Sequence, residues 1–306
     1  MSGAAPLVHI DHFKMDFGKK NVIRDLSFDI YPGETFGLLG SNGSGKTTTI
    51  RALLGIYLPT QGTLQINGRA FRPENGIKLG YLPEERGLYK KESVIDVMVY
   101  FGKLKGLNRE VAHKWSVDYL EQVDLADKEK ISVDKLSSGE QQKIQLGVTI
   151  MNSPELLILD EPTKGFDPVN RRLLMNLIDA QKKLGSTVLM VTHQMEEVER
   201  LCDRIILLRD GVSRAYGTVE EVQDEFGNIV IHIEHEGKIP RSDKYRIIEE
   251  GDSNSKLEVQ SGMNSADILR EIIDAGVRVG KFTPTRKSLD DIFVEIYGSE
   301  ELQDQG

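Results

Sequence analysis

One octapeptide constrains the fold of this chain more than any other feature: Gly40-Ser41-Asn42-Gly43-Ser44-Gly45-Lys46-Thr47, with Thr48 following. It fits the pattern G-x-x-x-x-G-K-[ST], whose glycines let backbone N–H groups turn inward around phosphate groups. Lys46 supplies a positive charge to the terminal phosphates, and Thr47 supplies a hydroxyl for Mg²⁺. Such a loop needs a buried strand before it and a helix after it. The apolar run Thr35–Leu39 and the helical pattern from Lys46 to Gly55 meet both needs.

Two carboxylates follow a second apolar run. Leu156–Leu159 is typical of a strand buried on both faces of a parallel sheet, and Asp160 and Glu161 come directly after it. An acidic pair at the carboxyl end of a parallel strand can hold Mg²⁺ with one member and orient water with the other. A third run, Thr187–Val191, places His193 at the same edge of the sheet. The pattern therefore predicts a phosphate and metal site at this edge.

The remaining pattern predicts an α/β fold with two domains. A mainly parallel sheet surrounds the phosphate loop, flanked by an antiparallel β-subdomain and by a helical subdomain over about residues 90–150. Asp210-Gly211 indicates a hairpin turn late in this first domain, which spans residues 7–218. A small α+β domain is expected over residues 219–298, with strands at Ile229–His235, Tyr245–Ile248, Lys256–Val259 and Arg278–Phe282, and helices at Ser265–Ala275, capped by Ser265, and Leu289–Tyr297.

Composition and charge exclude several classes of protein. No apolar run approaches the roughly 20 residues that a membrane-spanning helix needs. Residues 220–306 hold 20 acidic and 10 basic residues, whereas the rest of the chain holds 28 and 29. An acidic tail domain and a neutral body argue against a nucleic-acid partner. The single cysteine, Cys202, excludes an internal disulfide, and we expect it to be packed in the core. Without a signal peptide, the chain is expected in the cytosol.

A further motif identifies a family. Leu136-Ser137-Ser138-Gly139-Glu140-Gln141-Gln142 opens a predicted helix, 21 residues ahead of Asp160 when counted from Gly139. Together with the phosphate loop, Asp160-Glu161-Pro162-Thr163, Gly165-Phe166-Asp167-Pro168 and His193, it resembles the ordered motif set of an ATP-binding cassette (ABC) ATPase. The resemblance covers about residues 7–218. It implies hydrolysis of ATP with Mg²⁺ by two subunits that close head to tail over two nucleotides.

The resemblance also implies a role for each matching residue. The loop from Gly40 to Thr48 is expected to hold the phosphates of ATP, with Lys46 also acting in catalysis. By position, Phe17 matches the aromatic residue that stacks on adenine, and His193 matches the sensor of the γ-phosphate. Glu161 matches the catalytic carboxylate, and Asp160 matches the magnesium-linked carboxylate. Asp167 matches the loop that couples the two sites, and Ser137 and Gly139 match the signature that caps the ATP of the other subunit.

Three positions depart from the family pattern. The signature more often has Gly at Ser138 and Gln at Glu140, and Glu84 lies where the family has a glutamine. A carboxylate at position 84 can itself bind Mg²⁺. The predicted metal ligands are therefore Thr47, Asp160 and Glu84.

The expected function is that of the ATP-binding subunit of a transporter, acting on a separate integral-membrane permease. The segment Gly80–Tyr89 and the ending Ser288–Phe293 are similar to a bacterial subgroup of sodium and drug exporters with a C-terminal extension. The resemblance implies a second, identical ATP-binding subunit as partner, and a peripheral location on the inner face of the cell membrane. Leu88, Tyr89, Val94, Val97 and Tyr100 are expected to form an exposed patch where the permease docks.

Two alternatives from other classes remain open. One is a soluble cassette ATPase of the translation or DNA-repair type, which usually carries two cassettes or a coiled-coil insertion. The other is a nucleotide-binding regulator with low turnover, favoured by Glu84 and Ser138. Glu161 and His193, which match the family pattern, speak against the second alternative.

Overall fold

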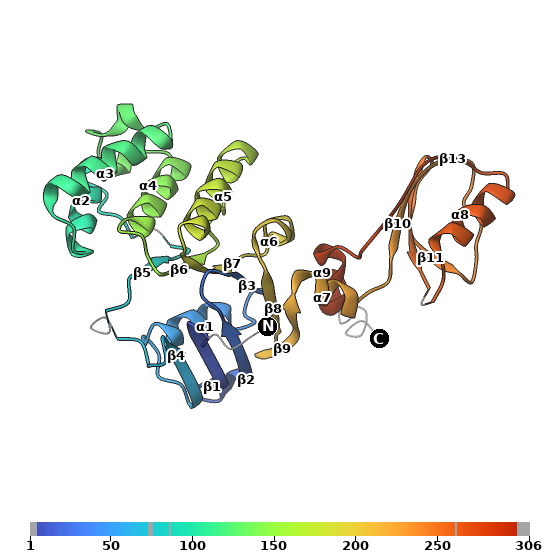
Figure 1. The fold of residues 1–306 in the computed structure, drawn as a ribbon, viewed down its shortest axis with the longest axis horizontal. Coiled ribbons are helices and arrows are strands. Elements are labelled where there is room, and N and C mark those ends of the chain that lie inside the picture. The colour runs from blue at the N-terminus through green and yellow to red at the C-terminus, as the bar shows by residue number, and fades with distance from the viewer. Residues whose placement is uncertain (1–4, 73–75, 86, 261, 299–306) are drawn as a thin grey trace. The chain divides into compact units, whose positions relative to one another are not determined.

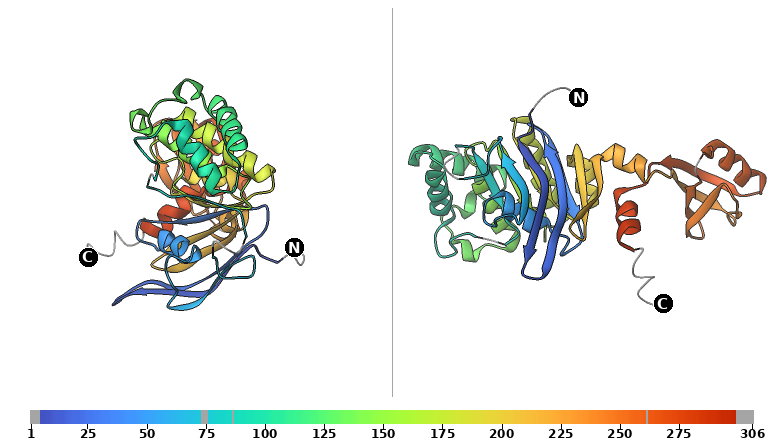
Figure 2. Two further views of the ribbon diagram at one scale, coloured as in Figure 1. Left: turned by 90° about the vertical axis from the view of Figure 1, so that its left-hand side faces the viewer. Right: turned by 90° about the horizontal axis from the view of Figure 1, so that it is seen from below.

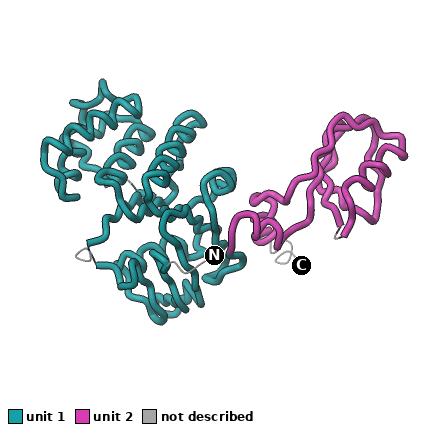
Figure 3. The backbone as a smooth tube through the Cα atoms, in the orientation of Figure 1, with its two compact units in different colours: residues 1–216 teal, residues 217–306 magenta. Residues whose placement is uncertain are grey.

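The computed structural model describes residues 5–72, 76–85, 87–260 and 262–298 of the 306-residue chain. The chain divides between Tyr216 and Gly217 into two units, residues 1–216 (unit 1) and residues 217–306 (unit 2), shown in Figure 3.

Unit 1 is built on a nine-stranded sheet with the strand order β4-β1-β2-β9-β8-β3-β7-β6-β5 (Figure 1). The strands are β1 Val8–Phe17, β2 Lys20–Ile30, β3 Thr35–Gly40, β4 Gln61–Ile66, β5 Leu79–Leu82, β6 Leu156–Asp160, β7 Thr187–Val191, β8 Arg204–Arg209 and β9 Val212–Thr218. The five strands β8, β3, β7, β6 and β5 run parallel to one another, whereas β1 pairs antiparallel with both β2 and β4. The predicted mainly parallel sheet with an antiparallel β-subdomain is confirmed.

The parallel strands are buried because helices cover the sheet. The helices of unit 1 are α1 Lys46–Leu53, α2 Val94–Leu104, α3 Arg109–Gln122, α4 Ser138–Ile150, α5 Pro168–Lys183 and α6 Met195–Leu201. All residues of β3, β6 and β7 are buried, which explains their unalternated apolar sequences. Each fully buried Leu or Ile side chain there contributes about 1.5–3 kcal/mol. In Figure 1 and in the left-hand view of Figure 2, α2, α3 and α4 lie at the top of unit 1 and β1 and β2 lie at the bottom.

The hairpin between β8 and β9 turns at the predicted dipeptide. Asp210 and Gly211 both have positive φ, at 53° and 72°. A two-residue turn of type I′ requires positive φ at both positions, which Asp and Gly tolerate. Cys202, which ends α6, is buried, as predicted for a packed cysteine.

Unit 2 has a four-stranded antiparallel sheet in the order β11-β12-β10-β13. Its elements are α7 Val219–Glu225, β10 Val230–Glu236, β11 Tyr245–Glu250, β12 Asn254–Val259, α8 Ser265–Asp274, β13 Arg278–Thr285 and α9 Leu289–Gly298. Ile268 and Ile272 lie one turn apart on α8 and are fully buried in a cluster with Ile231 and Leu257 of the sheet. The predicted α+β character is confirmed.

Two local predictions for unit 2 need correction. The cap of α8 is Asn264 rather than Ser265, because the Asn264 Oδ1 accepts a hydrogen bond of 2.8 Å from the Ala266 N–H. The sequence pattern also missed α7. This helix begins with a capping box in which Thr218 and Glu221 accept hydrogen bonds from each other's backbone N–H groups.

Among the described residues, no helix is both long enough and apolar enough to cross a membrane.

Candidate functional site

The phosphate loop connects β3 to α1, as the motif requires. Gly45 adopts φ +110°, and a Cβ atom there would overlap the Ile23 side chain. At Gly40, a Cβ atom would lie 2.6 Å from the Leu208 carbonyl oxygen. The loop therefore tolerates only glycine at these two positions, and its backbone is free to approach a ligand closely. Asn42 and Gly43 are exposed, and Ser41, Thr47 and Thr48 are half-buried.

Lys46 is folded over its own loop. Its Nζ donates hydrogen bonds to the Gly40 oxygen at 2.8 Å and the Ser41 oxygen at 2.9 Å. Burial lowers the pKa of Lys46, while the charges of Glu161, Asp160 and Glu84 oppose this change. The lysine thus lies between the loop and a group of carboxylates.

The loop has the features that a triphosphate needs. The Ser44 Oγ is buried and, within the described part of the chain, has no hydrogen-bond partner. A buried polar atom without a partner is costly, so a ligand oxygen at this point would stabilise it. Together with the glycine cradle and Lys46, this hydroxyl fits the phosphates of ATP.

Asp160 is the last residue of β6, and Glu161 follows it directly. Asp160 is 2% exposed. Its pKa is raised to about 6, first by burial and then by the charges of Glu84 and Glu161, while Lys46 acts in the opposite direction. These influences show that the three carboxylates and the lysine share one electrostatic environment.

Glu161 is held in a strained conformation that aims its side chain at His193. Its φ is +50°, a region that non-glycine residues rarely adopt, and its N–H donates to the Val191 oxygen at 2.8 Å. The His193 Nδ1 lies 2.9 Å from the Glu161 carboxylate, and the His193 Nε2 lies 3.1 Å from the Gln194 Nε2. A neutral imidazole with its proton on Nδ1 satisfies both contacts. The structure thus brings together two residues from different strands.

Glu84 is paired with a residue that the sequence did not single out. Its Oε1 accepts from the Lys164 Nζ at 2.5 Å, and both side chains are exposed. Among the described residues, no group of three or more His, Cys, Asp or Glu side chains is arranged to hold a metal by itself. A Mg²⁺ held by Thr47 and Asp160 would therefore need ligand oxygens from ATP and water.

Phe17 lies at the end of β1 with an accessible ring. It is 45% exposed, and its ring meets that of Tyr57 edge to face with centroids 5.3 Å apart. The Tyr57 hydroxyl in turn accepts a hydrogen bond from Arg51 at 3.0 Å. This support on one side holds the Phe17 ring in a defined orientation.

The signature residues cap a helix. Ser137 is the N-cap of α4, and it forms a capping box with Glu140, whose Oε2 accepts from the Ser137 N–H at 2.7 Å. A Cβ atom at Gly139 would lie 3.2 Å from the ring of Phe166, so the backbone packs closely there. Ser137 is exposed and Gly139 half-buried, which leaves this helix N-terminus accessible from outside.

Asp167 caps the next helix. Its Oδ1 accepts hydrogen bonds from the Val169 and Asn170 N–H groups at 2.9 and 3.0 Å, at the start of α5. These bonds, with Asn170 contributing most, lower the pKa of Asp167. The side chain is exposed, so capping leaves its outer face accessible to a partner.

The predicted docking patch is only partly exposed. Tyr89 and Tyr100 are 54% and 44% exposed, but Val94 and Val97 are buried in the helical subdomain, and Leu88 is half-buried. The prediction was wrong for the two valines because they face the inner side of α2. A hollow of about 420 Å³ remains, lined by Tyr89, Glu92, Asp96, Val97 and Tyr100.

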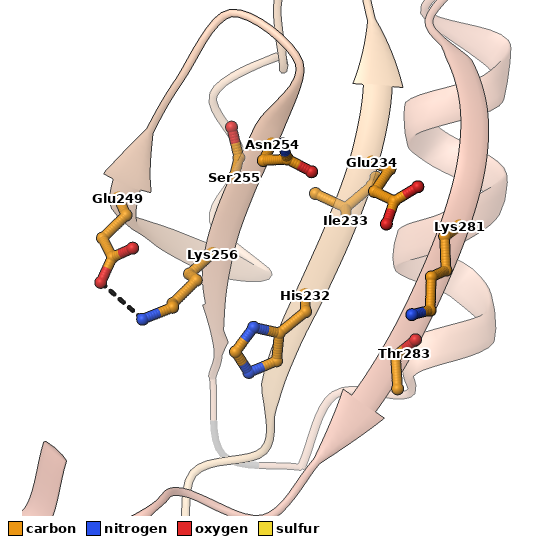
Figure 4. Close-up of a pocket in the computed structure, with 9 residues that line it drawn as sticks. All are labelled: His232, Ile233, Glu234, Glu249, Asn254, Ser255, Lys256, Lys281 and Thr283. Carbon is orange, nitrogen blue, oxygen red and sulfur yellow. Dashed lines mark hydrogen bonds and ion pairs between the residues drawn. The ribbon is translucent and has the colours of Figure 1, made fainter. Parts of the chain in front are cut away.

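A second hollow, of about 380 Å³, lies on the polar face of the sheet in unit 2 (Figure 4). Lys256 is paired there with Glu249 at 2.6 Å, and His232, Glu234 and Lys281 stand beside them. The negative charges of two glutamates balance the positive charges of two lysines, so this hollow favours neither an anion nor a cation.

Comparisons with known proteins agree with this geometry. Residues 23–164 match the family described as ABC transporter, and residues 217–297 match the C-terminal domain of DrrA1-3-like ATP-binding proteins. The uncharacterized ABC transporter ATP-binding protein YhaQ of Bacillus subtilis is 38% identical over 96% of this chain and 99% of its own length. Nod factor export ATP-binding protein I of Paraburkholderia xenovorans is 36% identical over 74% of this chain and 76% of its own.

A solved structure of the ATP-binding subunit of an ABC transporter is similar, with a TM-score of 0.66 and 28% identity over 72% of this chain and 93% of that one. The motifs, the fold and these relatives agree. The chain belongs to the ATP-binding proteins of ABC transporters, which are ATPases, and carries a DrrA-like C-terminal domain.

Proposed function

We propose that this chain powers export: it hydrolyses ATP with Mg²⁺ as a head-to-tail dimer and drives a separate membrane permease at the inner face of the cell membrane. The observation that carries the chemical part is the contact of 2.9 Å between His193 and Glu161 beside the phosphate loop. Export is supported by the similarity to a Nod factor export ATP-binding protein.

Glu161 is the residue that orients and activates the attacking water. A carboxylate at this edge accepts a proton from water, and His193 holds the carboxylate in place while its other nitrogen meets Gln194. Lys46 and the N-terminus of α1 bind the phosphates, and Thr47 and Asp160 would hold Mg²⁺, whose positive charge would offset negative charge on the phosphate oxygens.

The proposed dimer is supported by residues that lie at the surface. Ser137 and Gly139 present a hydroxyl and a close-packed backbone at the N-terminus of α4, which favours an anion such as a γ-phosphate. Asp167 is similarly exposed at the N-terminus of α5. We assign Ser137 and Gly139 to the nucleotide of the second subunit, and Asp167 to the loop that couples the two sites across the dimer.

The permease contact is assigned to the hollow beside Tyr89. The Tyr89 ring lies against those of Tyr100 and Phe101, with centroids 5.4 and 6.0 Å apart, and Glu92 and Asp96 border the same hollow. Exposed aromatic rings beside carboxylates are suited to a polypeptide segment with apolar and basic side chains. Apart from Arg86, which lies outside the described residues, the loop from Glu84 to Tyr89 links this hollow to the nucleotide site.

The test is recovery of the protein with its partner from membranes in mild detergent. We expect a polytopic membrane protein to co-purify with the wild-type chain, and Tyr89→Glu to reduce that recovery several-fold. Leu184→Glu is the control, because Leu184 is also an exposed apolar residue, 73% exposed at the end of α5. Co-purification with ribosomes or DNA, and not with membranes, would overturn the export proposal and support the soluble-cassette alternative.

A further inference from the structure

The ion pair between Glu84 and Lys164 joins two loops at the nucleotide edge of the sheet. Glu84 follows β5 and Lys164 follows β6, and these strands are parallel neighbours with Leu82 opposite Leu159. Their loops therefore leave the same edge of the sheet. The contact of 2.5 Å between the Lys164 Nζ and the Glu84 Oε1 crosses 80 residues of sequence.

Glu84 adds negative charge where a triphosphate is to bind. After burial, it is the largest influence that raises the pKa of Asp160, and it also acts on Lys46. Asp160 and Glu161 already place two carboxylates at this edge. A third carboxylate in place of an amide disfavours ATP through repulsion, unless a cation offsets it.

Lys164 is placed to be that cation. The hydrogen bond and charge of Glu84 are the main causes that raise the pKa of Lys164, and the charges of Glu161 and Asp160 act in the same direction. Exposed ion pairs contribute little to folding stability. The contribution of this pair is therefore expected in ligand binding rather than in the stability of the fold.

We propose that Lys164 is a positioning residue for nucleotide binding, which holds Glu84 in an ion pair and offsets the charge that this carboxylate adds to the phosphate site. The inference rests on ATP binding at the phosphate loop. It treats positions 84 and 164 as one unit: a carboxylate at 84 requires a cation at 164, whereas an amide at 84 does not.

The experiment measures equilibrium binding of a fluorescent ATP analogue to the full chain, first in EDTA and then with Mg²⁺. Without Mg²⁺, Lys164→Met is expected to weaken binding by about 5- to 20-fold, because one carboxylate becomes uncompensated near the phosphates. Glu84→Gln is expected to bind as well as the wild type or up to about threefold more tightly. In the double variant Lys164→Met with Glu84→Gln, binding returns to within about threefold of the wild type, because the amide needs no cation.

Controls separate this effect from a general loss of charge or of folding. Lys114→Met removes another exposed lysine, paired with Asp118 at 2.9 Å on α3, and is expected to leave binding unchanged. Lys164→Arg keeps the charge and is expected to bind like the wild type. Thermal unfolding without nucleotide is expected to be the same for all these proteins.

Three outcomes would overturn the inference. Unchanged binding by Lys164→Met would leave the pair as a surface contact. A double variant as weak as Lys164→Met would show that Lys164 acts on the phosphates without Glu84. If Lys164→Met lowered the unfolding temperature as well as the affinity for the nucleotide, the result would indicate a structural role. Absence of binding by the wild type itself is a different result, because it contradicts the nucleotide site rather than the role of Lys164.

Discussion

At the scale of single residues, Glu161 combines backbone strain with a defined partner. Its φ of +50° and its contact with His193 fix the direction of the carboxylate, which is half-buried at the edge of the sheet. Strain that persists at such a position is a mark of function. The carboxylate is therefore the group whose removal is expected to affect chemistry more than binding.

Glu161→Gln keeps the shape of the side chain but removes the negative charge that accepts a proton from water. We expect the variant to bind ATP and its turnover to fall by at least about tenfold. ATP-bound dimers should accumulate, which size-exclusion chromatography with ATP can detect. Turnover equal to that of the wild type would remove Glu161 from the catalytic role.

The raised pKa of Asp160 predicts that the stability of the fold depends on pH in the absence of ligands. Its pKa is raised from 3.8 to about 6 in the folded chain, so between these values the folded state holds a proton that the unfolded state releases. The stabilisation from this group is complete below about pH 3.8 and is lost as the pH rises through about 6. A pKa shift of this size corresponds to a change of about 1–3 kcal/mol in the free energy of unfolding.

The measurement compares the wild type with Asp160→Asn in EDTA. The unfolding temperature of the variant minus that of the wild type should become more positive between pH 4.5 and pH 7.5, since the amide does not titrate. Carboxyl groups remote from Asp160 titrate in both proteins and cancel in the difference. A difference that stays constant with pH would contradict the raised pKa.

At the scale of elements, the capping box of α4 gives a physical reason for one departure from the family pattern. Glu140 is the third residue of the helix, and its carboxylate accepts from the Ser137 N–H while the Ser137 Oγ accepts from the Glu140 N–H. Glutamine can make the same contact, but a negative charge interacts more favourably with a helix N-terminus. Nothing in the structure explains Ser138 in place of glycine.

Most elements of the fold could be predicted because each has a local signal. Buried parallel strands are continuous apolar runs, and the carboxyl ends of such strands meet at one edge of a sheet. That rule predicts that Glu161 and His193, which follow neighbouring strands, lie close together. The pair Glu84–Lys164 does not, because it depends on the conformations of two loops that no periodic pattern describes.

The failures also have physical causes. Val94 and Val97 occur at helical spacing, but the spacing alone does not say which face of α2 is covered. Asn264 and Ser265 are both good caps, so adjacent candidates leave the boundary of α8 open by one residue. The short helix α7 lacks an apolar stripe, as only Val222 is buried.

At the scale of the whole molecule, the proposed dimer would divide each nucleotide site between two chains. The phosphate loop with Asp160 and Glu161 lies at the carboxyl ends of the strands, whereas Ser137 and Gly139 open α4 and are accessible from outside. The proposed head-to-tail dimer would join the loop of one subunit to the signature of the other, and symmetry would then produce two equal sites. In this proposal, the sites are complete only in the dimer.

This arrangement predicts that two inactive chains restore activity when mixed. Lys46→Ala removes the phosphate-loop cation, and Gly139→Asp adds a side chain 3.2 Å from the Phe166 ring and a negative charge at the start of α4. Each homodimer lacks a working site, but a heterodimer contains one, formed by the intact loop and the intact signature from different chains. Random pairing puts up to about a quarter of all sites in working form. ATP hydrolysis by the mixture should therefore exceed the sum of the separate proteins, and its absence from purified heterodimers would show that the signature does not act across the dimer.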